Sequence, residues 1–244
     1  MTENIAIEVP VVSTPPLAPR GLPKEAVDVL LRTAHTEKSP VKRLRNETIL
    51  ALLIYGGLRV QEVCDVQLRD LDLGAGTLTV RSGKAGKARR IPLHPDAQGI
   101  LRRYLDKVRC PNGMPLIGTA EESEPLLVRL KVNVAGQPFA PGVTQQVAQR
   151  ILRQLGKQAA ANLNEEAVQE ASLTRSEQLK TLAHRLENVT PHQLRHSLAQ
   201  RMIKSGAQLS EVQRILGHSR LSTTGIYLTP SEDDLRDAIN RAGL

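Results

Sequence analysis

Aromatic side chains are scarce in this sequence of 244 residues, which has no tryptophan, one phenylalanine and three tyrosines. Surfaces that bind unpaired nucleic acid bases stack them on aromatic rings, so this scarcity argues against such a surface. Cysteine is also scarce, and Cys64 and Cys110 alone cannot form a disulfide framework. The longest apolar run, residues 49–58, includes two glycines and is far too short to span a bilayer. The first residues lack the basic start and apolar stretch of a secretory signal. We therefore expect a cytoplasmic protein that does not enter a membrane.

Positive charge is what the sequence has in excess. Lysine and arginine number 33 against 25 acidic residues, which gives a net charge of +8 and an isoelectric point near 9.8. The charge is uneven, because residues 81–90 carry five basic side chains and no acidic one. Residues 159–188, in contrast, carry five glutamates and only three basic side chains. A basic protein of this kind favours a polyanionic partner, and the lack of aromatic residues favours a duplex over single strands. The acidic stretch is expected to lie away from that partner.

The chain divides into a short arm and one folded domain. Residues 1–20 contain four prolines and few charges, which predicts an extended or disordered arm. Residues 21–244 form the predicted domain, with an inserted segment of uncertain order at about 159–188. Apolar spacing and helix-capping residues predict helices, and short runs joined by glycine-containing turns predict strands. The helices are expected over 40–55, from 95 to 108, over 143–155, from 191 to 205, over 209–216, after 224 and from 232, and the strands over 71–73, 77–80 and 89–93. This is a mainly α fold with a small three-stranded antiparallel sheet (α+β).

The helix that follows Thr190 carries the first candidate chemistry. Thr190 and Gln193 form a capping box with a proline at the first helical position, so His192 lies in the first turn. Arg195 follows three residues later on the same face, and such a pair suits an anionic ligand. Taken alone, the pair is better explained by a histidine that bonds a backbone carbonyl and an arginine in a surface ion pair. His196 lies one turn from His192, but a zinc protease helix needs glutamate where this chain has Gln193, so we expect no metal site.

Further candidates are scattered along the chain. Arg59 follows a glycine pair at a turn between helices, with Glu62 within reach of its backbone or guanidinium. Lys84 lies in a glycine-flanked hairpin loop, and His218 follows a glycine that ends a helix. Tyr227 is the one tyrosine outside an apolar stripe that would bury it. Each of these residues, taken alone, has an ordinary structural explanation.

Taken together, the motifs resemble those of one family. In chain order they are Gly57-Leu58-Arg59-Val60-Gln61-Glu62, Gly83-Lys84-Ala85-Gly86-Lys87, Thr190-Pro191-His192-Gln193-Leu194-Arg195-His196, Leu216-Gly217-His218-Ser219 and Ser222-Thr223-Thr224-Gly225-Ile226-Tyr227. Their order and spacing closely resemble the tyrosine recombinases, the family of phage integrases and Xer-type proteins. The resemblance covers residues 21–244 and implies the catalytic-domain fold of that family. Most members place a further helical domain before this part, and here only about twenty residues precede it. The chain is therefore expected to be either a recombinase with a minimal DNA clamp or a fragment.

The resemblance also implies a reaction and a set of roles. The reaction would be site-specific recombination of double-stranded DNA through a 3′-phosphotyrosyl intermediate, with Tyr227 as the nucleophile. Arg59 and Arg195 would bind the nonbridging phosphate oxygens, Lys84 would protonate the leaving 5′-oxygen, His192 would transfer a proton and His218 would hydrogen-bond the phosphate. Basic residues around the hairpin loop would contact DNA; they are Lys87, Arg89 and Arg90. Bidentate arginines and a proton donor supply the charge stabilisation that this chemistry needs, so no metal and no other cofactor is expected.

Partners and alternatives follow from the same resemblance. The expected partners are duplex DNA and further copies of the chain, as a homodimer or homotetramer on DNA, with no membrane. One alternative is a type IB topoisomerase-like activity, which uses a similar residue set but rejoins the same strand. Another is a DNA-binding accessory protein that keeps the fold without catalysis; the presence of all six catalytic positions argues against it. The segment from 231 to 242 is amphipathic and would pack either on a neighbouring copy or on its own domain.

Overall fold

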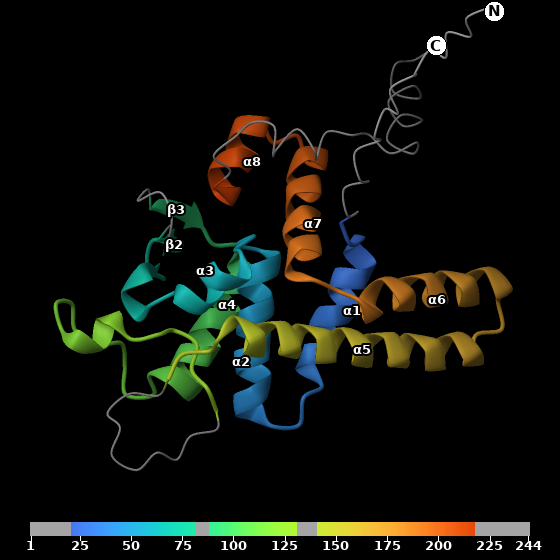
Figure 1. The fold of residues 1–244 in the computed structure, drawn as a ribbon, viewed down its shortest axis with the longest axis horizontal. Helices are drawn as coiled ribbons and strands as arrows, with labels where there is room; N and C mark the ends of the chain where they lie inside the picture. Colours follow the sequence, from blue (N-terminus) through green and yellow to red (C-terminus); the bar gives the residue numbers. More distant parts are fainter. Residues whose placement is uncertain (1–20, 82–87, 131–140, 218–244) are drawn as a thin grey trace, which may run out of the picture.

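The computed structural model describes residues 21–81, 88–130 and 141–217 (Figure 1). The predicted arm over residues 1–20 lies outside these ranges, as do the helices predicted beyond residue 224. The elements in chain order are α1 (Lys24–His35), α2 (Pro40–Ile54), α3 (Val60–Asp65), the 3₁₀ turn η1 (Leu68–Asp70), β1 (Leu71–Asp72), β2 (Thr77–Val80), β3 (Arg89–Pro92), α4 (Pro95–Tyr104), the π-helical turn η2 (Leu105–Arg109), the 3₁₀ turn η3 (Ala120–Ser123), α5 (Gln145–Gln169), α6 (Leu173–Glu187), α7 (Pro191–Lys204) and α8 (Leu209–Leu216). The mainly helical prediction is confirmed.

The sheet has the predicted three strands in the order β1-β2-β3, and both pairs are antiparallel. Leu78 in the central strand pairs with Leu71 on one side and Ile91 on the other, and all three side chains are buried. Gly76 has a φ of 63°, a left-handed conformation that glycine adopts without strain, and it allows the tight turn between β1 and β2. β1 and β3 each end one residue earlier than predicted. The sheet therefore follows from the short apolar runs and, between β1 and β2, from a glycine turn.

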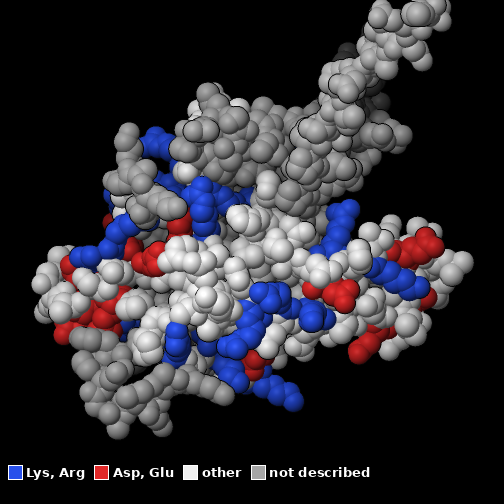
Figure 2. Space-filling model, viewed as in Figure 1, with Lys and Arg blue, Asp and Glu red and all other residues white. Residues whose placement is uncertain are grey.

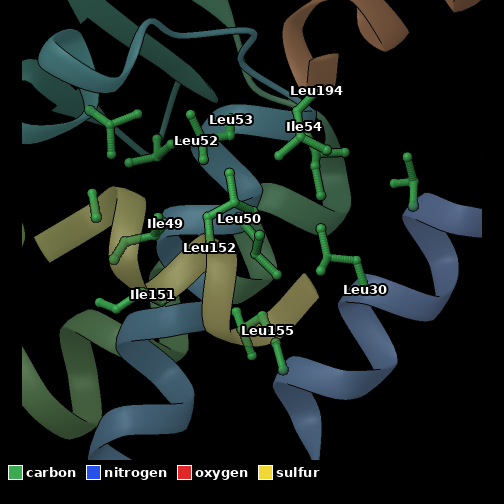
Figure 3. Packing of buried hydrophobic residues seen from close by; sticks show 14 of the residues in the cluster. Leu30, Ile49, Leu50, Leu52, Leu53, Ile54, Ile151, Leu152, Leu155 and Leu194 are labelled. Atoms are coloured by element: carbon green, nitrogen blue, oxygen red, sulfur yellow. The ribbon is translucent and has the colours of Figure 1, made fainter. Parts of the chain in front are cut away.

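The core is built around α2. Every residue of α2 from Asn46 onward is buried, as expected of a helix enclosed by other elements rather than lying at the surface. Leu50 of α2 lies beside Leu152 of α5, and Ile54 of α2 lies near Leu194 of α7 (Figure 3). Helices α1, α4, α5 and α7 all contact α2. α2 ends at Ile54, just before Gly56 and Gly57, the two glycines predicted to end it.

Helices α5 and α6 form a long antiparallel hairpin, which extends to the right in Figure 1. The hairpin includes residues 159–188, for which the sequence predicts no definite structure, and these residues are helical except at the turn over 170–172 and at Asn188. Small and apolar side chains pair the two helices: Ala159, Ala160, Leu163 and Ala167 from α5, and Leu179, Ala183 and Leu186 from α6. α6 also contacts α1, so the hairpin packs on the rest of the core.

Helices α7 and α8 begin and end at the predicted signals. The Thr190 hydroxyl accepts a hydrogen bond from the Gln193 backbone N–H, and the Gln193 side chain accepts one from the Thr190 backbone N–H at 2.8 Å. Gly217 ends α8 in a left-handed conformation with φ 67°. Ala199 of α7 and Val212 and Leu216 of α8 are buried together in a small second cluster. No helix within the described ranges is long and apolar enough to cross a membrane.

Candidate active site

Three of the predicted catalytic residues line one hollow of about 230 Å³. Arg59 is the N-cap residue of α3, so its side chain leaves from the first turn of that helix. His192 and Arg195 come from the first two turns of α7, where the capping box fixes the start of the helix. Gln145 and Gln149 from the N-terminal end of α5 also line the hollow. The structure thus brings together side chains that are more than 130 residues apart in sequence.

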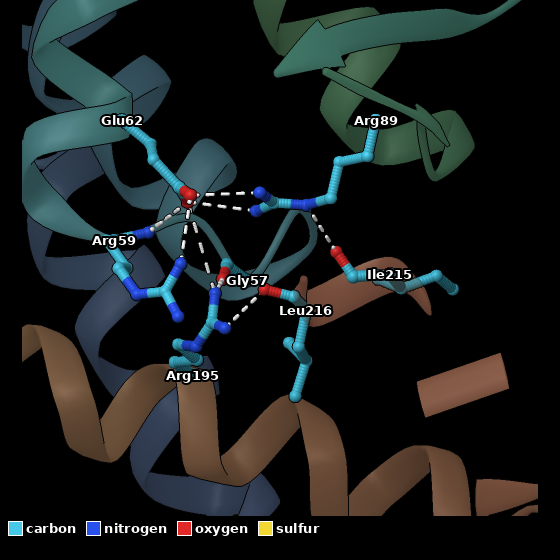
Figure 4. Close-up of polar contacts among 7 residues, drawn as sticks. All are labelled: Gly57, Arg59, Glu62, Arg89, Arg195, Ile215 and Leu216. Carbon is cyan, nitrogen blue, oxygen red and sulfur yellow. Dashed lines mark hydrogen bonds and ion pairs between the residues drawn. The ribbon is translucent and has the colours of Figure 1, made fainter. Parts of the chain in front are cut away.

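Glu62 lies at the centre of a group of three arginines, shown in Figure 4. Its carboxylate accepts hydrogen bonds from the Arg59 backbone N–H at 2.8 Å and from Arg59 Nη1 at 3.1 Å. Arg89 Nη1 and Nη2 donate to the two carboxylate oxygens at 2.9 Å each. Arg195 Nη1 lies 4.0 Å from Glu62 Oε2. We call these four residues the arginine–glutamate cluster. Its three guanidinium charges exceed its one carboxylate charge, so the cluster favours an anion.

Arg195 is the most deeply buried of the three arginines, with 3% of its surface exposed. Its guanidinium donates to the carbonyl oxygens of Gly57, at the end of α2, and Leu216, at the end of α8. These bonds satisfy two carbonyl groups near helix ends, and they join α7 to two other segments. Arg195 is therefore held in a fixed orientation at the edge of the hollow.

Arg59 is more accessible, since 45% of its side chain is exposed. Its guanidinium is anchored to Glu62 through Nη1 and lines the hollow. A partly exposed guanidinium that is bonded through one nitrogen still has other N–H groups that can donate to an external anion. Arg59 and Arg195 together therefore present guanidinium donors on two sides of one hollow.

Arg89 and Arg90, both predicted to contact DNA, lie in different surroundings. Arg89 is 12% exposed, and besides Glu62 it bonds the Ile215 carbonyl through Nε at 2.9 Å. Arg90 is 58% exposed and bonds Thr77 and Asp72 at the outer side of the sheet. Neighbouring residues in a strand point to opposite faces, and this alternation explains the contrast.

The electrostatics of the cluster keep Glu62 ionised. Burial alone would raise the pKa of Glu62, but the hydrogen bonds from Arg89 and the Arg59 backbone, with the nearby charges of Arg89 and Arg195, hold that pKa below its ordinary value. His196, on α7 beside the site, has a lowered pKa because it is partly buried and lies near His192 and Arg195. Both effects are typical of a site with excess positive charge.

Four predicted site residues lie outside the described ranges: Lys84, Lys87, His218 and Tyr227. Their roles therefore remain predictions from the resemblance. Within the described ranges, no three histidine, cysteine, aspartate or glutamate side chains are grouped so that they could hold a metal ion. The described part of the site can bind an anion through guanidinium groups, and His192 supplies a group able to donate or accept a proton.

Three features of the site were not predicted. Glu62 was expected to reach Arg59 but not to hold three arginines, because its contacts with Arg89 and Arg195 depend on tertiary packing. Arg89 was predicted to lie on the DNA-binding surface, yet the strand alternation places it on the same face as buried Ile91. The alternation of side chains along a strand, with Arg89 two residues before the apolar Ile91, was the sequence signal that could have predicted this placement. Nothing in the sequence pattern distinguishes Gln145 and Gln149 from other polar residues at a helix start.

Known proteins resemble the chain over most of its length. The model of the phage integrase family matches residues 20–233. The tyrosine recombinase XerA of Pyrococcus furiosus is 30% identical over 230 residues, which are 94% of this chain and 64% of that protein. The tyrosine recombinase XerC of Halalkalibacterium halodurans is 33% identical over 219 residues, 90% of this chain and 60% of its own length. The chain thus spans less than two thirds of these two relatives.

Solved structures show the same fold. The crystal structure of XerA recombinase matches with a TM-score of 0.66 and 26% identity, over 94% of this chain and 67% of that one. The XerH site-specific recombinase, in a post-cleavage complex with a palindromic difH substrate, matches with a TM-score of 0.61 and 21% identity, over 91% of this chain and 52% of that one. From the family match over residues 20–233 and the shared fold, we conclude that the chain belongs to the phage integrase family.

Proposed function

We propose that this chain carries the catalytic part of a tyrosine site-specific recombinase, which cleaves and rejoins duplex DNA through a 3′-phosphotyrosyl intermediate. The observation that carries the proposal is the convergence of Arg59, His192 and Arg195 on one hollow beside Glu62. The relatives XerA and XerC are named tyrosine recombinases, and they support the same reaction. We further propose a cytoplasmic location, where a recombinase meets its DNA.

The chemistry assigned to each residue balances protons and bonds. The Tyr227 hydroxyl oxygen attacks the phosphorus of the scissile phosphodiester, and the bond from phosphorus to the 5′-oxygen breaks. His192 takes up the phenolic proton, and Lys84 gives a proton to the departing 5′-oxygen. His218 donates a hydrogen bond to the phosphate. The phosphotyrosyl bond keeps the energy of the original bond, so a 5′-hydroxyl of a partner duplex can attack it in turn.

Arg59 and Arg195 are assigned to the nonbridging phosphate oxygens. The phosphodiester gains negative charge in its five-coordinate transition state, and two guanidinium groups already in place stabilise that charge. The backbone carbonyls of Gly57 and Leu216 orient Arg195 before any substrate arrives. Because the donors are held in advance, less reorganisation is needed when the charge develops.

Duplex DNA is the proposed partner, with two or four copies of the chain assembled on it. The XerH structure named above is a complex with a difH substrate, which supports DNA as the ligand. Basic side chains are spread over the centre of the face shown in Figure 2. The N-terminal half of α5, which begins at the hollow, contributes exposed Arg150, Arg153 and Lys157. This arrangement suits the backbone of a duplex that runs past the hollow.

The first test of the function uses Tyr227→Phe on a nicked duplex, in which cleavage traps the covalent adduct. The variant lacks the nucleophilic oxygen but keeps nearly all phosphate contacts. We expect no adduct and a dissociation constant for DNA within about tenfold of the wild type. An adduct formed by Tyr227→Phe would refute the nucleophile assignment.

A second test separates recombination from the topoisomerase-like alternative. The wild-type chain is incubated with a plasmid that carries two copies of its binding site. Recombination predicts exchange of flanking DNA only between matching sites. Relaxation of supercoils by single copies, without any exchange, would instead support the topoisomerase-like activity.

A further inference from the structure

Arg89 enters the arginine–glutamate cluster from β3, on a different side of the Glu62 carboxylate from Arg59 and Arg195 (Figure 4). Its Nη1 and Nη2 each lie 2.9 Å from a Glu62 oxygen, and its Nε donates to the Ile215 carbonyl of α8. Three of its five N–H groups are thus engaged inside the protein. Its side chain is also only 12% exposed. Little of Arg89 is left to contact a phosphate outside the fold.

The contacts of Arg89 fix the orientation of Glu62. Two parallel hydrogen bonds from a planar guanidinium hold both the position and the plane of a carboxylate. Glu62 then orients Arg59 through two hydrogen bonds and lies 4.0 Å from Arg195. A lysine at position 89 would keep the charge, but a single ammonium group cannot bind both oxygens and the Ile215 carbonyl in this planar geometry.

We propose that Arg89 is a positioning residue for the phosphate-binding pair Arg59 and Arg195, acting through Glu62 and the end of α8, and that it does not contact DNA. The assignment of a phosphate ligand rests on the function proposed above. Arg90 differs, because its exposed side chain bonds only Asp72 and Thr77 of the sheet in the described structure. The two neighbouring arginines of β3 therefore have separate roles.

The test compares Arg89→Lys and Arg89→Ala with a matched buried arginine. Arg109 is 13% exposed, pairs with Glu124 and bonds the Pro125 carbonyl through Nε at 3.0 Å, but it lies outside the site. Arg109→Lys therefore controls for loss of a buried arginine pair. We expect both Arg89 variants to slow adduct formation on saturating DNA by roughly tenfold to a hundredfold, because misplaced groups lose much of their catalytic effect. Arg109→Lys should retain the wild-type rate.

DNA affinity separates positioning from direct contact. Dissociation constants measured over a range of salt should change by less than about threefold in Arg89→Lys and Arg89→Ala, and the salt dependence should keep its slope. A residue that contacts a phosphate would instead weaken binding and reduce that slope by about one when replaced by alanine. A wild-type cleavage rate in Arg89→Lys, or a reduced slope in Arg89→Ala, would overturn the proposal.

A double-mutant cycle tests whether Arg89 acts through Glu62. If it does, Arg89→Ala should slow adduct formation much less in a Glu62→Gln background than in the wild type. In that background the carboxylate that accepts the two hydrogen bonds of Arg89 is already replaced. If the rate loss of the double variant equals the product of the losses of the two single variants, Arg89 does not act through Glu62 and the proposal is contradicted. Thermal unfolding of all variants shows which of them are folded at the assay temperature.

A readout that needs no catalysis distinguishes failure of this proposal from failure of the proposed function. Inorganic phosphate, at constant ionic strength, should raise the melting temperature of the wild type and Arg109→Lys by similar amounts, because it binds the folded site. The shift should be much smaller in Arg89→Lys. Absence of any adduct in the wild type would refute the recombinase function alone, whereas equal phosphate shifts in all three proteins would refute the role of Arg89.

Discussion

At the scale of single residues, the site depends on one carboxylate among three guanidinium groups. Glu62 is nearly buried, with 10% of its side chain exposed, and it separates positive charges that would otherwise repel one another. Removing one partner of a buried ion pair lowers the unfolding free energy by more than the intact pair contributes to it. The reason is that the remaining buried charge has no opposite charge beside it. Glu62 is therefore needed for stability as well as for the orientation of Arg59 and Arg195.

This charge balance predicts a pH-dependent effect of Glu62→Gln. The pKa of Glu62 in the folded protein lies below its ordinary value of 4.5, so folding favours the ionised form. The stability that this group contributes is complete above pH 4.5 and is lost as the pH falls through the lower, folded-state pKa. We expect Glu62→Gln to lose roughly 3 kcal/mol of unfolding free energy at neutral pH, and less relative to the wild type under acid conditions.

Urea denaturation of both proteins over a pH series measures this difference. Glu165→Gln on α5 is a suitable control, because Glu165 is exposed and belongs to no ion pair in the described structure. It should change the unfolding free energy by less than about 0.5 kcal/mol. A stability difference between Glu62→Gln and the wild type that stays constant from neutral to acid pH would contradict the assignment of the lowered pKa.

At the scale of elements, the α5–α6 hairpin depends on one close approach. Gly156 of α5 has no side chain, and a Cβ there would overlap the Leu186 carbonyl oxygen and lie 2.5 Å from Val189 Cγ1. Backbone atoms cannot move aside as a flexible side chain can. The glycine thus allows the end of α6 to pass directly against α5, just before the chain enters α7.

Two glycine substitutions are expected to act in opposite directions. Gly156→Ala should lower the unfolding free energy by about 1–3 kcal/mol, because the added methyl group overpacks a close contact. Gly99→Ala in α4 is the matched control, since its Cβ would meet only Arg103 Nη1 at 3.7 Å. Alanine there should raise stability by about 0.5–1 kcal/mol through its higher helix propensity. Denaturation curves would measure the unfolding free energy of both variants. An unchanged unfolding free energy in Gly156→Ala would show that α5 and α6 can move apart without loss of stability.

Local signals predicted most elements of the fold, and the exceptions have physical causes. The capping box at Thr190 and the glycines that end α2 and α8 act within a few residues, so the sequence shows them directly. α1 was not among the predicted helices: it begins after Pro23 without a side-chain cap, although its buried residues have helical spacing. The helices over 159–188 are hard to predict because alanines form much of their contact, and alanine is a weak sign of burial.

The site was predicted in part for a similar reason. Arg59, His192 and Arg195 could be identified because they belong to short motifs that resemble a known family. Their convergence is a tertiary property, as is the second carboxylate contact that Arg89 makes from a distant strand. No spacing along the chain encodes a distance between α3, α7 and β3. The sequence could therefore name these residues, and Glu62 as a neighbour of Arg59, but not the contacts of that carboxylate with Arg89 and Arg195.

At the scale of the whole molecule, charge is graded along α5. The helix begins at the hollow with Gln145 and Gln149, continues through exposed Arg150 and Arg153, and reaches exposed glutamates sixteen residues after Gln149. At 1.5 Å per residue, the acidic end lies about 24 Å from the hollow. The acidic segment thus lies at the end of α5 that is remote from the hollow, and its avoidance of a polyanionic ligand stays a prediction.

This gradient predicts the salt dependence of binding to duplex DNA. If the protein contacts six or more phosphates, its affinity should fall by about a thousandfold or more between about 50 and 200 mM salt, because bound counterions are released on association. The double substitution Glu165→Gln/Glu166→Gln raises the net charge yet should leave the slope unchanged, since these residues lie far from the hollow. Fluorescence anisotropy titrations would measure both slopes. A nearly flat salt response of the wild type would contradict a phosphate-binding face.

The end of α8 connects these scales. Its last two carbonyl groups, from Ile215 and Leu216, accept hydrogen bonds from Arg89 and Arg195, so the helix terminus and the anion site share their donors. An anion that binds Arg195 in this fixed orientation should stabilise the final turn of α8, because the same guanidinium holds the Leu216 carbonyl, and by thermodynamic reciprocity an ordered turn should favour binding of the anion. Amide hydrogen exchange at Gly217 would thus report occupancy of a hollow that this glycine does not line.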